Sequence, residues 1–235
     1  MHNISISPEI TARLRSWRER DHLFEDLDPA RTAHIVIDLQ NGFMAPGALV
    51  EISTAREVVP NVNRISAALR EAGGTNIFIS WTILEVDHAN WSTWYSKFAS
   101  EDRAQAMYDT FAKGAEGNKL WPGLDIQPED LTVDKGRFSA FVPGTSQLPD
   151  ILKARGVDTL IITGTATNVC CESNARDAMQ QNYQVIFVAD ATAAASDAEH
   201  NSALDNLAMF ADIMTTEEVI FFLNEAAALR SKAAE

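Results

Sequence analysis

The chain has little cysteine, and no two of its cysteines are placed to join distant segments. Its two cysteines, Cys170 and Cys171, are adjacent in a sequence of 235 residues. Adjacent thiols suit neither a disulfide framework nor the ligand spacing of a zinc site. We therefore expect free thiols and a reducing compartment, the cytoplasm.

Long apolar runs and clusters of positive charge are also missing. No apolar stretch approaches the length that spans a bilayer, and the first residues lack the apolar core of a signal peptide. Lys and Arg number 19 against 33 Asp and Glu, which gives a formal net charge of -14. Because nucleic acids and anionic membranes attract basic surfaces, we expect neither as a partner.

Two further binding patterns are absent. The first expected strand runs into DLQNGF instead of a Gly-rich phosphate turn, which excludes a dinucleotide-binding module. The five histidines show no spacing typical of a metal site or a Cys–His pair, and His34 is expected to be a satisfied core or edge residue. We expect no metal and no cofactor.

What the sequence does contain is an alternation of short, Ile- and Val-rich strands with helices. Strands are expected near residues 33–38, 76–81, 130–134, 160–162, 184–189 and 211–215. The helices between them are expected near residues 54–72, 99–111, 146–155, 197–210 and 217–231, with one more that begins at the cysteines. This alternation predicts an α/β, three-layer Rossmann-like fold, with a mostly parallel sheet of about six strands and helices on both faces.

The first 30 residues are expected to stand apart from this domain, which occupies residues 31–235. Residues 8–20 have the pattern of a short amphipathic helix that opens at Ser7 and Pro8. The polar stretch up to Arg31 is typical of a surface arm, which could cover a neighbouring subunit.

Chemically useful side chains follow three of the expected strands. Asp38 ends the first strand and Lys135 follows the third. In open α/β sheets the ligand crevice lies at the carboxyl ends of the strands, so we expect both side chains at that edge. The alternatives are a loop cap for Asp38 and a solvated charge for Lys135.

The third strand-end group is a cysteine in the stretch DTLIITGTATNVCCESNARDA. A strand stops at Gly164, Thr167 and Asn168 are candidate caps, and a helical pattern starts at once. Cys170 falls in the first helical turn, where unpaired N–H groups and the helix dipole favour a thiolate. Cys171 lies on the apolar helix side and is expected in the core, whereas Cys170 shares its side with Asn174 and Asp177.

Asp38, Lys135 and Cys170 together supply what thiol-dependent amide hydrolysis needs. The thiolate attacks, a cation keeps it ionised, and an acid protonates the departing amine. No histidine is required.

The chain resembles the isochorismatase-like cysteine hydrolases along nearly its whole length after residue 30. The matching pieces are IVIDLQNGF, VDKGRFSAF and GTATNVCCESNARDA. In ATNVC and the following ES the chain is most similar to the branch that holds ureidoacrylate amidohydrolase and N-carbamoylsarcosine amidohydrolase. The resemblance implies an amidohydrolase that cleaves a C–N bond of a small amide or ureido compound, and a homo-oligomer, dimer or tetramer.

Position by position, the resemblance implies a catalytic triad of Asp38, Lys135 and Cys170. It also implies a non-proline cis peptide between Thr165 and Ala166, which aims the Ala166 N–H into an oxyanion hole beside that of Cys170. The mechanism that follows is proton transfer from the thiol to Asp38, thiolate attack, departure of ammonia or an amine, and hydrolysis of a thioester.

Departures from relatives bear on the metal and the substrate. Nicotinamidase-like relatives bind a metal at places where this chain has Leu84, Val86 and Asn90, so we expect none. Ureido-cleaving relatives have a Gln-Asn pair where this chain has Ser80 and Trp81.

Three residues are expected to bind the substrate: Asn41, Trp81 and Phe138. Trp81 with Phe138 opposite favours a flatter or more apolar amide, and the ureido alternative stays open. The aromatic residues between 81 and 98 suggest either a lid or subunit contact, or a small core beneath a long loop.

Two other functions stay open. One is an isochorismatase-type hydrolase that cleaves a vinyl ether without a covalent thiol intermediate. The other is a non-catalytic binding protein of the same fold, for which a broken triad would be the mark.

Overall fold

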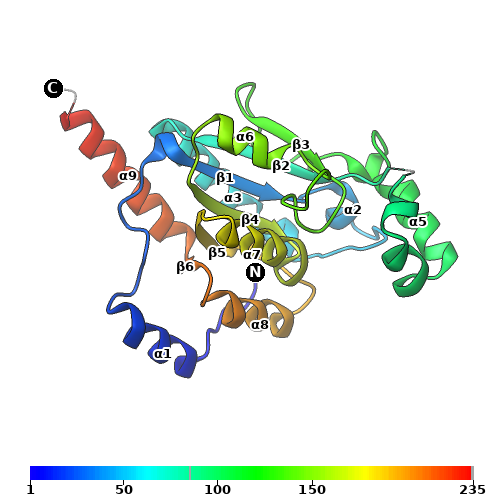
Figure 1. Ribbon diagram of the computed structural model, residues 1–235, viewed down its shortest axis with the longest axis horizontal. Helices are drawn as coiled ribbons and strands as arrows, with labels where there is room; N and C mark the ends of the chain where they lie inside the picture. The colour runs from blue at the N-terminus through cyan, green and yellow to red at the C-terminus, as the bar shows by residue number, and fades with distance from the viewer. Residues whose placement is uncertain (85, 234–235) are drawn as a thin grey trace.

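The computed structural model describes residues 1–84 and 86–233 of the chain. Within these ranges one sheet of six parallel strands forms the centre of the molecule, in the order β3-β2-β1-β4-β5-β6 (Figure 1). The strands are β1 (Thr32–Ile37), β2 (Thr75–Trp81), β3 (Leu131–Lys135), β4 (Thr159–Thr165), β5 (Gln184–Ala193) and β6 (Asp212–Met214). The predicted alternation and fold class are confirmed.

Helices and short helical turns connect the strands. The longer helices are α1 (Pro8–Arg18), α3 (Ala55–Ala72), α5 (Glu101–Phe111), α6 (Leu148–Ala154), α7 (Glu172–Gln180), α8 (Asp197–Leu207) and α9 (Thr216–Ala233). The short pieces are η1 (Pro29–Arg31), α2 (Asn41–Met44), α4 (Asp87–Asn90), η2 (Trp94–Phe98), η3 (Glu116–Asn118) and η4 (Thr167–Cys171).

Each face of the sheet buries its own apolar core, which gives three layers. Helices α3 and α9 pack together and cover one face, where Val36 and Phe78 meet Val62 and Leu223. Helices α6, α7 and α8 cover the other face, where Ile35 lies in the second core (Figure 1). Strands buried on both faces are nearly continuous apolar runs, which is why the sequence pattern found them.

The contact between β1 and β4 brings two chemically important strand ends together. Ile37 pairs with Gly164 in the parallel register. Gly164 has φ +117°, and a Cβ at that position would collide with the main chain of Ile37. Glycine is therefore required for the close approach of the two strands just before each one delivers its functional group.

Two elements differ from the prediction. Strand β5 continues to Ala193 past Asp190, whose carboxylate accepts from the N–H and hydroxyl of Thr216 (2.7 and 2.8 Å) and so does not break the strand. The chain after β4 begins with the π-helical turn η4, and α7 starts only at Glu172. Neither Thr167 nor Asn168 is the N-cap of this turn: Ala166 takes that position, and the buried Thr167 side chain pairs with His200 (2.9 Å).

The N-terminal arm lies against its own chain. The main-chain N–H groups of Ser5 and Ser7 donate to Asn201 and Asp205 of α8 (3.0 and 2.7 Å). Further along, the N–H groups of Leu23 and Phe24 donate to the Asp212 carboxylate. In this chain the arm thus covers the edge of the sheet at β6.

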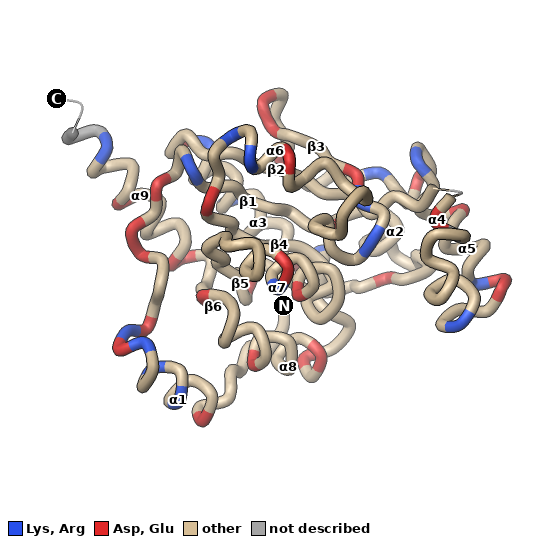
Figure 2. Tube along the Cα trace, in the orientation of Figure 1, with Lys and Arg blue, Asp and Glu red and all other residues tan. Residues whose placement is uncertain are grey.

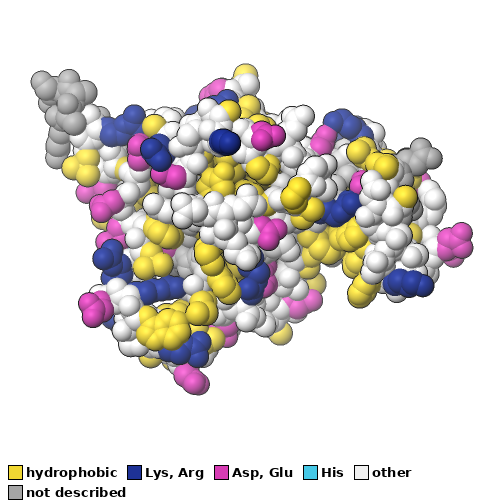
Figure 3. All heavy atoms as spheres, in the orientation of Figure 1, with side chains coloured by type: hydrophobic (Ala, Val, Ile, Leu, Met, Phe, Trp, Pro, Cys, Tyr) yellow, Lys and Arg dark blue, Asp and Glu magenta, His cyan; other side chains and the backbone are white. Residues whose placement is uncertain are grey.

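The surface mixes both signs of charge. Figure 2 shows basic residues interspersed with acidic ones along the chain, several of them on α1, and Figure 3 shows the same mixture over one face. No helix within the described residues is both long and apolar enough to cross a bilayer.

Candidate active site

The carboxyl ends of β1, β3 and β4 bring Asp38, Lys135 and Cys170 together. Lys135 Nζ lies 2.8 Å from Asp38 Oδ2 and 3.5 Å from Cys170 Sγ. All three side chains are buried, with exposed fractions of 0%, 1% and 4% for Asp38, Lys135 and Cys170. Strand β2 lies between β1 and β3, so the long lysine side chain is needed to bridge from β3 to Asp38.

The lysine ammonium is fully engaged. Its third bond goes to the main-chain carbonyl of Arg137 (3.0 Å), so a carboxylate, a carbonyl and a sulfur accept its three N–H donors. Burial acts to lower the pKa of Lys135, but the negative charge of Asp38 and the hydrogen bonds to Asp38 and Cys170 outweigh it and leave that pKa raised. Lys135 is therefore a permanent cation beside the thiol.

Asp38 has an unusual backbone and one free oxygen. Its φ of +54° lies in the left-handed region, which aspartate tolerates better than most residues. Its main-chain N–H donates to the carbonyl of Ile79 (2.9 Å), and its main-chain carbonyl accepts from the N–H of Gln40 (2.8 Å). Among the described residues, Oδ1 has no hydrogen-bond partner. Strained backbone of this kind clusters at functional sites.

The pKa values at this site favour a neutral thiol next to an ion pair. Burial, opposed by the Lys135 charge, raises the pKa of Asp38 above its usual range. Burial, the larger cause, and the Asp38 charge both raise the pKa of the Cys170 thiol. Together they outweigh Lys135, which lowers it. Burial therefore acts against the thiolate that a position near a helix start favours.

The two cysteines occupy different places, as their helix positions indicated. Cys171 is completely buried in the core that covers one face of the sheet, with its thiol directed to the Thr163 carbonyl. Burial raises the pKa of Cys171 well above its usual range. Cys170 contacts the ammonium of Lys135, so it alone of the two shares the ionic cluster.

The turn before Cys170 has the expected local geometry. The peptide bond between Thr165 and Ala166 is cis. The Ala166 carbonyl accepts from the N–H groups of Val169 and Cys171, both at 3.1 Å. The Thr165 hydroxyl donates to the Ala193 carbonyl (3.0 Å), which ties the turn to β5.

The three expected substrate-binding residues lie in different surroundings. The Asn41 amide donates to the main-chain carbonyl and the carboxylate of Glu116 at the surface (3.1 and 3.0 Å). Trp81 is 2% exposed, and its ring packs 5.0 Å from that of Phe111. Phe138 is half-buried, and its ring lies 6.3 Å from the ring of Trp81, in line with the expectation that the two lie opposite each other.

The aromatic segment at residues 87–98 packs onto the loop that follows β3. The rings of Trp91 and Trp94 meet the ring of Phe138 edge to face, with centroids 4.9 and 5.2 Å apart. Arg137 lies over the Trp91 ring (5.0 Å) and pairs with Asp87 (2.9 Å). Tyr95 of the same segment is buried in the core that α3 and α9 cover, so these contacts fit both interpretations.

Sequence reasoning overlooked two buried amides that hold the site together. The Gln40 side chain donates to the Trp81 carbonyl and accepts from its N–H (3.0 and 2.8 Å), which joins the ends of β1 and β2. Asn174 donates to the Cys170 carbonyl (2.8 Å). Two sequence positions could have indicated these amides: Gln40 lies two residues after Asp38, and Asn174 lies one helical turn after Cys170.

Within the described residues, no group of three or more His, Cys, Asp and Glu side chains is arranged to hold a metal ion.

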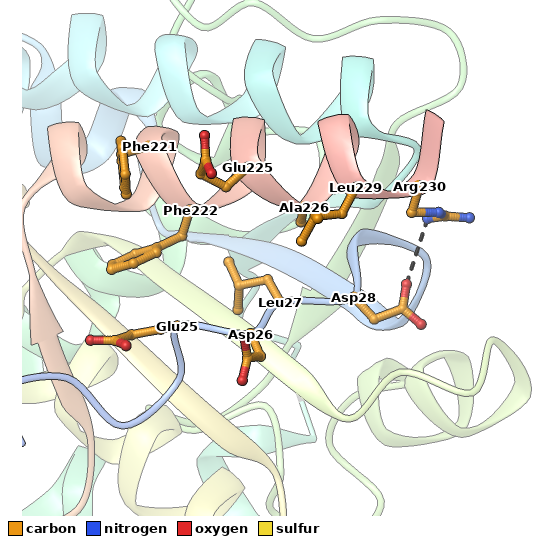
Figure 4. Close-up of a pocket in the computed structure, with 10 residues that line it drawn as sticks. All are labelled: Glu25, Asp26, Leu27, Asp28, Phe221, Phe222, Glu225, Ala226, Leu229 and Arg230. Carbon is orange, nitrogen blue, oxygen red and sulfur yellow. Dashed lines mark ion pairs between the residues drawn. The ribbon is translucent and has the colours of Figure 1, made fainter. Parts of the chain in front are cut away.

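A cavity of about 580 Å³ lies between residues 25–28 and the outer half of α9 (Figure 4). Phe222 and Leu27 approach it from its two sides, and Asp28 pairs with Arg230 of α9 at one end (3.5 Å). It shares no residue with the triad.

Comparison with known proteins identifies the relatives of this chain. The model of the isochorismatase domain family matches residues 32–218. The ureidoacrylate amidohydrolase RutB of Methylobacterium radiotolerans is 34% identical over 197 residues, which cover 78% of this chain and 76% of that protein.

Solved structures agree with the fold. A cysteine hydrolase from Pseudomonas syringae pv. phaseolicola superposes with a TM-score of 0.75 at 27% identity, covering 88% of this chain and 99% of the other. An N-carbamoylsarcosine amidase from Thermoplasma acidophilum superposes with a TM-score of 0.62 at 21% identity, covering 79% and 96%, and supports the fold alone.

Proposed function

The chain belongs to the isochorismatase family, and from that premise we propose that it is a cysteine-dependent amidohydrolase. It cleaves the C–N bond of a small amide or ureido compound through a thioester and releases ammonia or an amine. The observation that carries this proposal is the buried cluster in which Lys135 Nζ lies 2.8 Å from Asp38 and 3.5 Å from Cys170.

The first step of the proposed reaction is proton transfer from the Cys170 thiol to Asp38. The raised pKa of the Asp38 carboxyl makes it a stronger base than an exposed aspartate, and its Oδ1 has no partner among the described residues. The Lys135 ammonium then stabilises the thiolate as it forms. A thiol that is neutral at rest thus becomes nucleophilic only when its proton has an acceptor.

The second step is attack of the Cys170 thiolate on the substrate carbonyl carbon. The new C–S bond forms as the C=O electron pair moves to oxygen, and the main-chain N–H groups of Ala166 and Cys170 stabilise the oxyanion. Protonated Asp38 gives its proton to the departing nitrogen as the C–N bond breaks. A water molecule, deprotonated by Asp38, then hydrolyses the thioester and restores the thiol.

Two substrate classes have separate support. Ureidoacrylate amidohydrolase relatives at 34% identity support a ureido acid. The ring cluster of Phe138 with Trp91 and Trp94 supports a flatter, uncharged amide, since aromatic side chains stack on planar groups. Arg137 already has a counter-ion in Asp87, so a substrate carboxylate would have to displace that carboxylate.

We also propose that the enzyme acts in the cytoplasm as a homo-oligomer. Its two free thiols suit a reducing compartment. Helix α9 exposes Phe221 and Leu229 (59% and 64%) beside the cavity of Figure 4, and exposed apolar side chains of this size are typical of subunit contacts. Light scattering during size-exclusion chromatography measures the oligomeric state directly.

The experiment that tests the function is ammonia release from a panel of ureido acids and flat primary amides. Wild type is compared with Cys170→Ala, and Cys171→Ala is the matched control because its thiol adjoins Cys170 in the chain. We expect one substrate class to turn over, Cys170→Ala to abolish turnover and Cys171→Ala to spare it. Full activity of Cys170→Ala, or turnover of isochorismate alone, would overturn the proposal.

A further inference from the structure

Asn174 is a buried amide whose hydrogen bonds all go to main-chain groups of the candidate site. Its side chain lies in the first turn of α7, and the residue is 1% exposed. Nδ2 donates to the carbonyls of Cys170 and Phe138 (2.8 and 3.1 Å), and Oδ1 accepts from the N–H of Ala140 (3.0 Å). Two carbonyls and one N–H define the amide orientation without ambiguity.

These bonds join the two segments that deliver the reacting groups. One segment carries Cys170, and the other is the loop that follows Lys135, the last residue of β3. The lysine ammonium returns to this loop through the Arg137 carbonyl (3.0 Å) and also reaches Cys170 Sγ (3.5 Å). The result is a closed ring of contacts from Cys170 through Asn174, the loop and Lys135 back to Cys170.

Few side chains could replace Asn174 at this position. An amide offers two donors and one acceptor, and all three functions are used. Serine could still donate to the carbonyl four residues earlier, which is Cys170, but it could not hold the loop. Aspartate could accept from Ala140, but it has no donor for the carbonyls of Cys170 and Phe138.

We propose that Asn174 is a positioning residue that fixes the separation between the Cys170 thiol and the Lys135 ammonium by joining their two segments. This inference rests on the proposed function of Cys170. Lys135 meets sulfur at 3.5 Å, so a small shift of the loop weakens the contact. A misplacement of about 1 Å in an active site can cost about 100-fold in rate.

The test compares Asn174→Ala, Asn174→Ser and Asn174→Asp with the wild type. The matched control is Asn76→Ala, since Asn76 is also a buried amide (2% exposed) that donates to a main-chain carbonyl, that of Ser66 (3.1 Å). Asn76 lies near the amino end of β2, away from the strand ends that carry the triad. It therefore reports the effect of losing a buried amide without touching the site.

All three Asn174 variants are expected to lower kcat by about 100-fold with little change in KM, because positioning acts on the chemical step. Asn76→Ala is expected to lower the melting temperature about as much as Asn174→Ala does, but to leave kcat unchanged. Asn174→Ser is the decisive variant, since it keeps the hydrogen bond to the Cys170 carbonyl and loses the hydrogen bonds to Phe138 and Ala140 of the loop. Wild-type kcat in Asn174→Ser would overturn the inference.

A crystal structure of Asn174→Ser provides a readout that needs no substrate. We expect the separation of Lys135 Nζ and Cys170 Sγ to exceed the wild-type distance, and an unchanged distance would overturn the inference. Cys170→Ala, assayed alongside, separates the function of the thiol from the role of Asn174. Activity in Cys170→Ala refutes the proposed function, whereas an inactive Cys170→Ala beside a fully active Asn174→Ser refutes only the role of Asn174.

Discussion

Lys135 and Asp38 form a completely buried ion pair, 2.8 Å from Nζ to Oδ2, between two strands that are not neighbours in the sheet. Removing two charges from water is costly, and replacing a buried ion pair with apolar groups is often neutral or stabilising. This pair is therefore weak evidence for a contribution to fold stability. The pair also contacts Cys170, the proposed nucleophile.

The first prediction concerns the two partners of this pair. Lys135→Met leaves the Asp38 carboxylate buried without a counter-ion, so we expect a loss of about 3–5 kcal/mol in the free energy of unfolding. Adding Asp38→Asn removes the uncompensated charge and should recover most of that loss. Urea denaturation of the two singles and the double measures this coupling.

Activity should behave differently from stability in the same set of variants. Each single variant is expected to lose about 1,000-fold or more in kcat/KM, and the double should be no worse, because members of one catalytic unit are not additive. Additive stability losses, or a double variant that regains activity as well as stability, would contradict the assignment.

The second prediction concerns Gly164, which packs against Ile37 at the end of β4. At its φ of +117° a Cβ is strained, and it would also collide with the Ile37 main chain. Gly164→Ala should lower the free energy of unfolding by about 3 kcal/mol or more and lower kcat as well, since β1 and β4 deliver Asp38 and Cys170. Gly144→Ala is the control, since it too has a positive φ (+77°) but a Cβ there meets open space.

Thermal unfolding monitored by circular dichroism distinguishes the two glycines. Backbone strain destabilises both variants, whereas the collision with Ile37 affects Gly164→Ala alone. A Gly164→Ala protein as stable as Gly144→Ala would show that β1 and β4 can separate freely, and the close approach of Ile37 and Gly164 would then not be required.

The third prediction concerns pH. Burial, aided by the neighbouring His2, lowers the pKa of His200 to about 4, so this residue is neutral in the fold. An unfolded histidine binds its proton near pH 6.5, so the stability that depends on neutral His200 is present above pH 6.5 and is lost as the pH falls toward 4. His200→Gln should make the unfolding free energy less dependent on pH in that window.

His22 provides a control of opposite sign. Burial lowers its pKa, but hydrogen bonds and charges from Asp212 and Glu218 outweigh burial and leave the pKa raised. Its contribution is therefore complete below pH 6.5 and is lost as the pH rises through the raised value. His22→Gln should destabilise the protein at pH 6 and much less at pH 9, and identical pH profiles for the two variants would contradict both assignments.

The sequence predicted the sheet and the meeting of Asp38, Lys135 and Cys170, because both follow from local patterns. Buried parallel strands are continuous apolar runs, and their carboxyl ends share one edge of the sheet. The sequence did not predict the end of β5, because an aspartate such as Asp190 usually ends a buried strand. In the fold, the N–H and hydroxyl of Thr216, from a distant segment, donate to its carboxylate.

The protonation state of Cys170 and the role of Asn174 could not be predicted in this way. Local sequence placed Cys170 near a helix start, which favours a thiolate, whereas burial, which depends on the whole fold, raises the pKa of the thiol. The bonds of Asn174 to Phe138 and Ala140 depend on the path of a loop 34 to 36 residues earlier in the chain. Patterns of helix and strand carry no information on that path.

Acylation of Cys170 during turnover is the event on which the proposed mechanism depends. Wild type and Cys171→Ala are mixed with the substrate found in the ammonia-release panel, quenched with acid within the first turnovers, and weighed intact by mass spectrometry. We predict a mass increase equal to the acyl group less the thiol hydrogen that it replaces, located on Cys170 by peptide mapping and absent from Cys170→Ala. Steady-state turnover with no adduct on Cys170, or an adduct on Cys171, would contradict the mechanism.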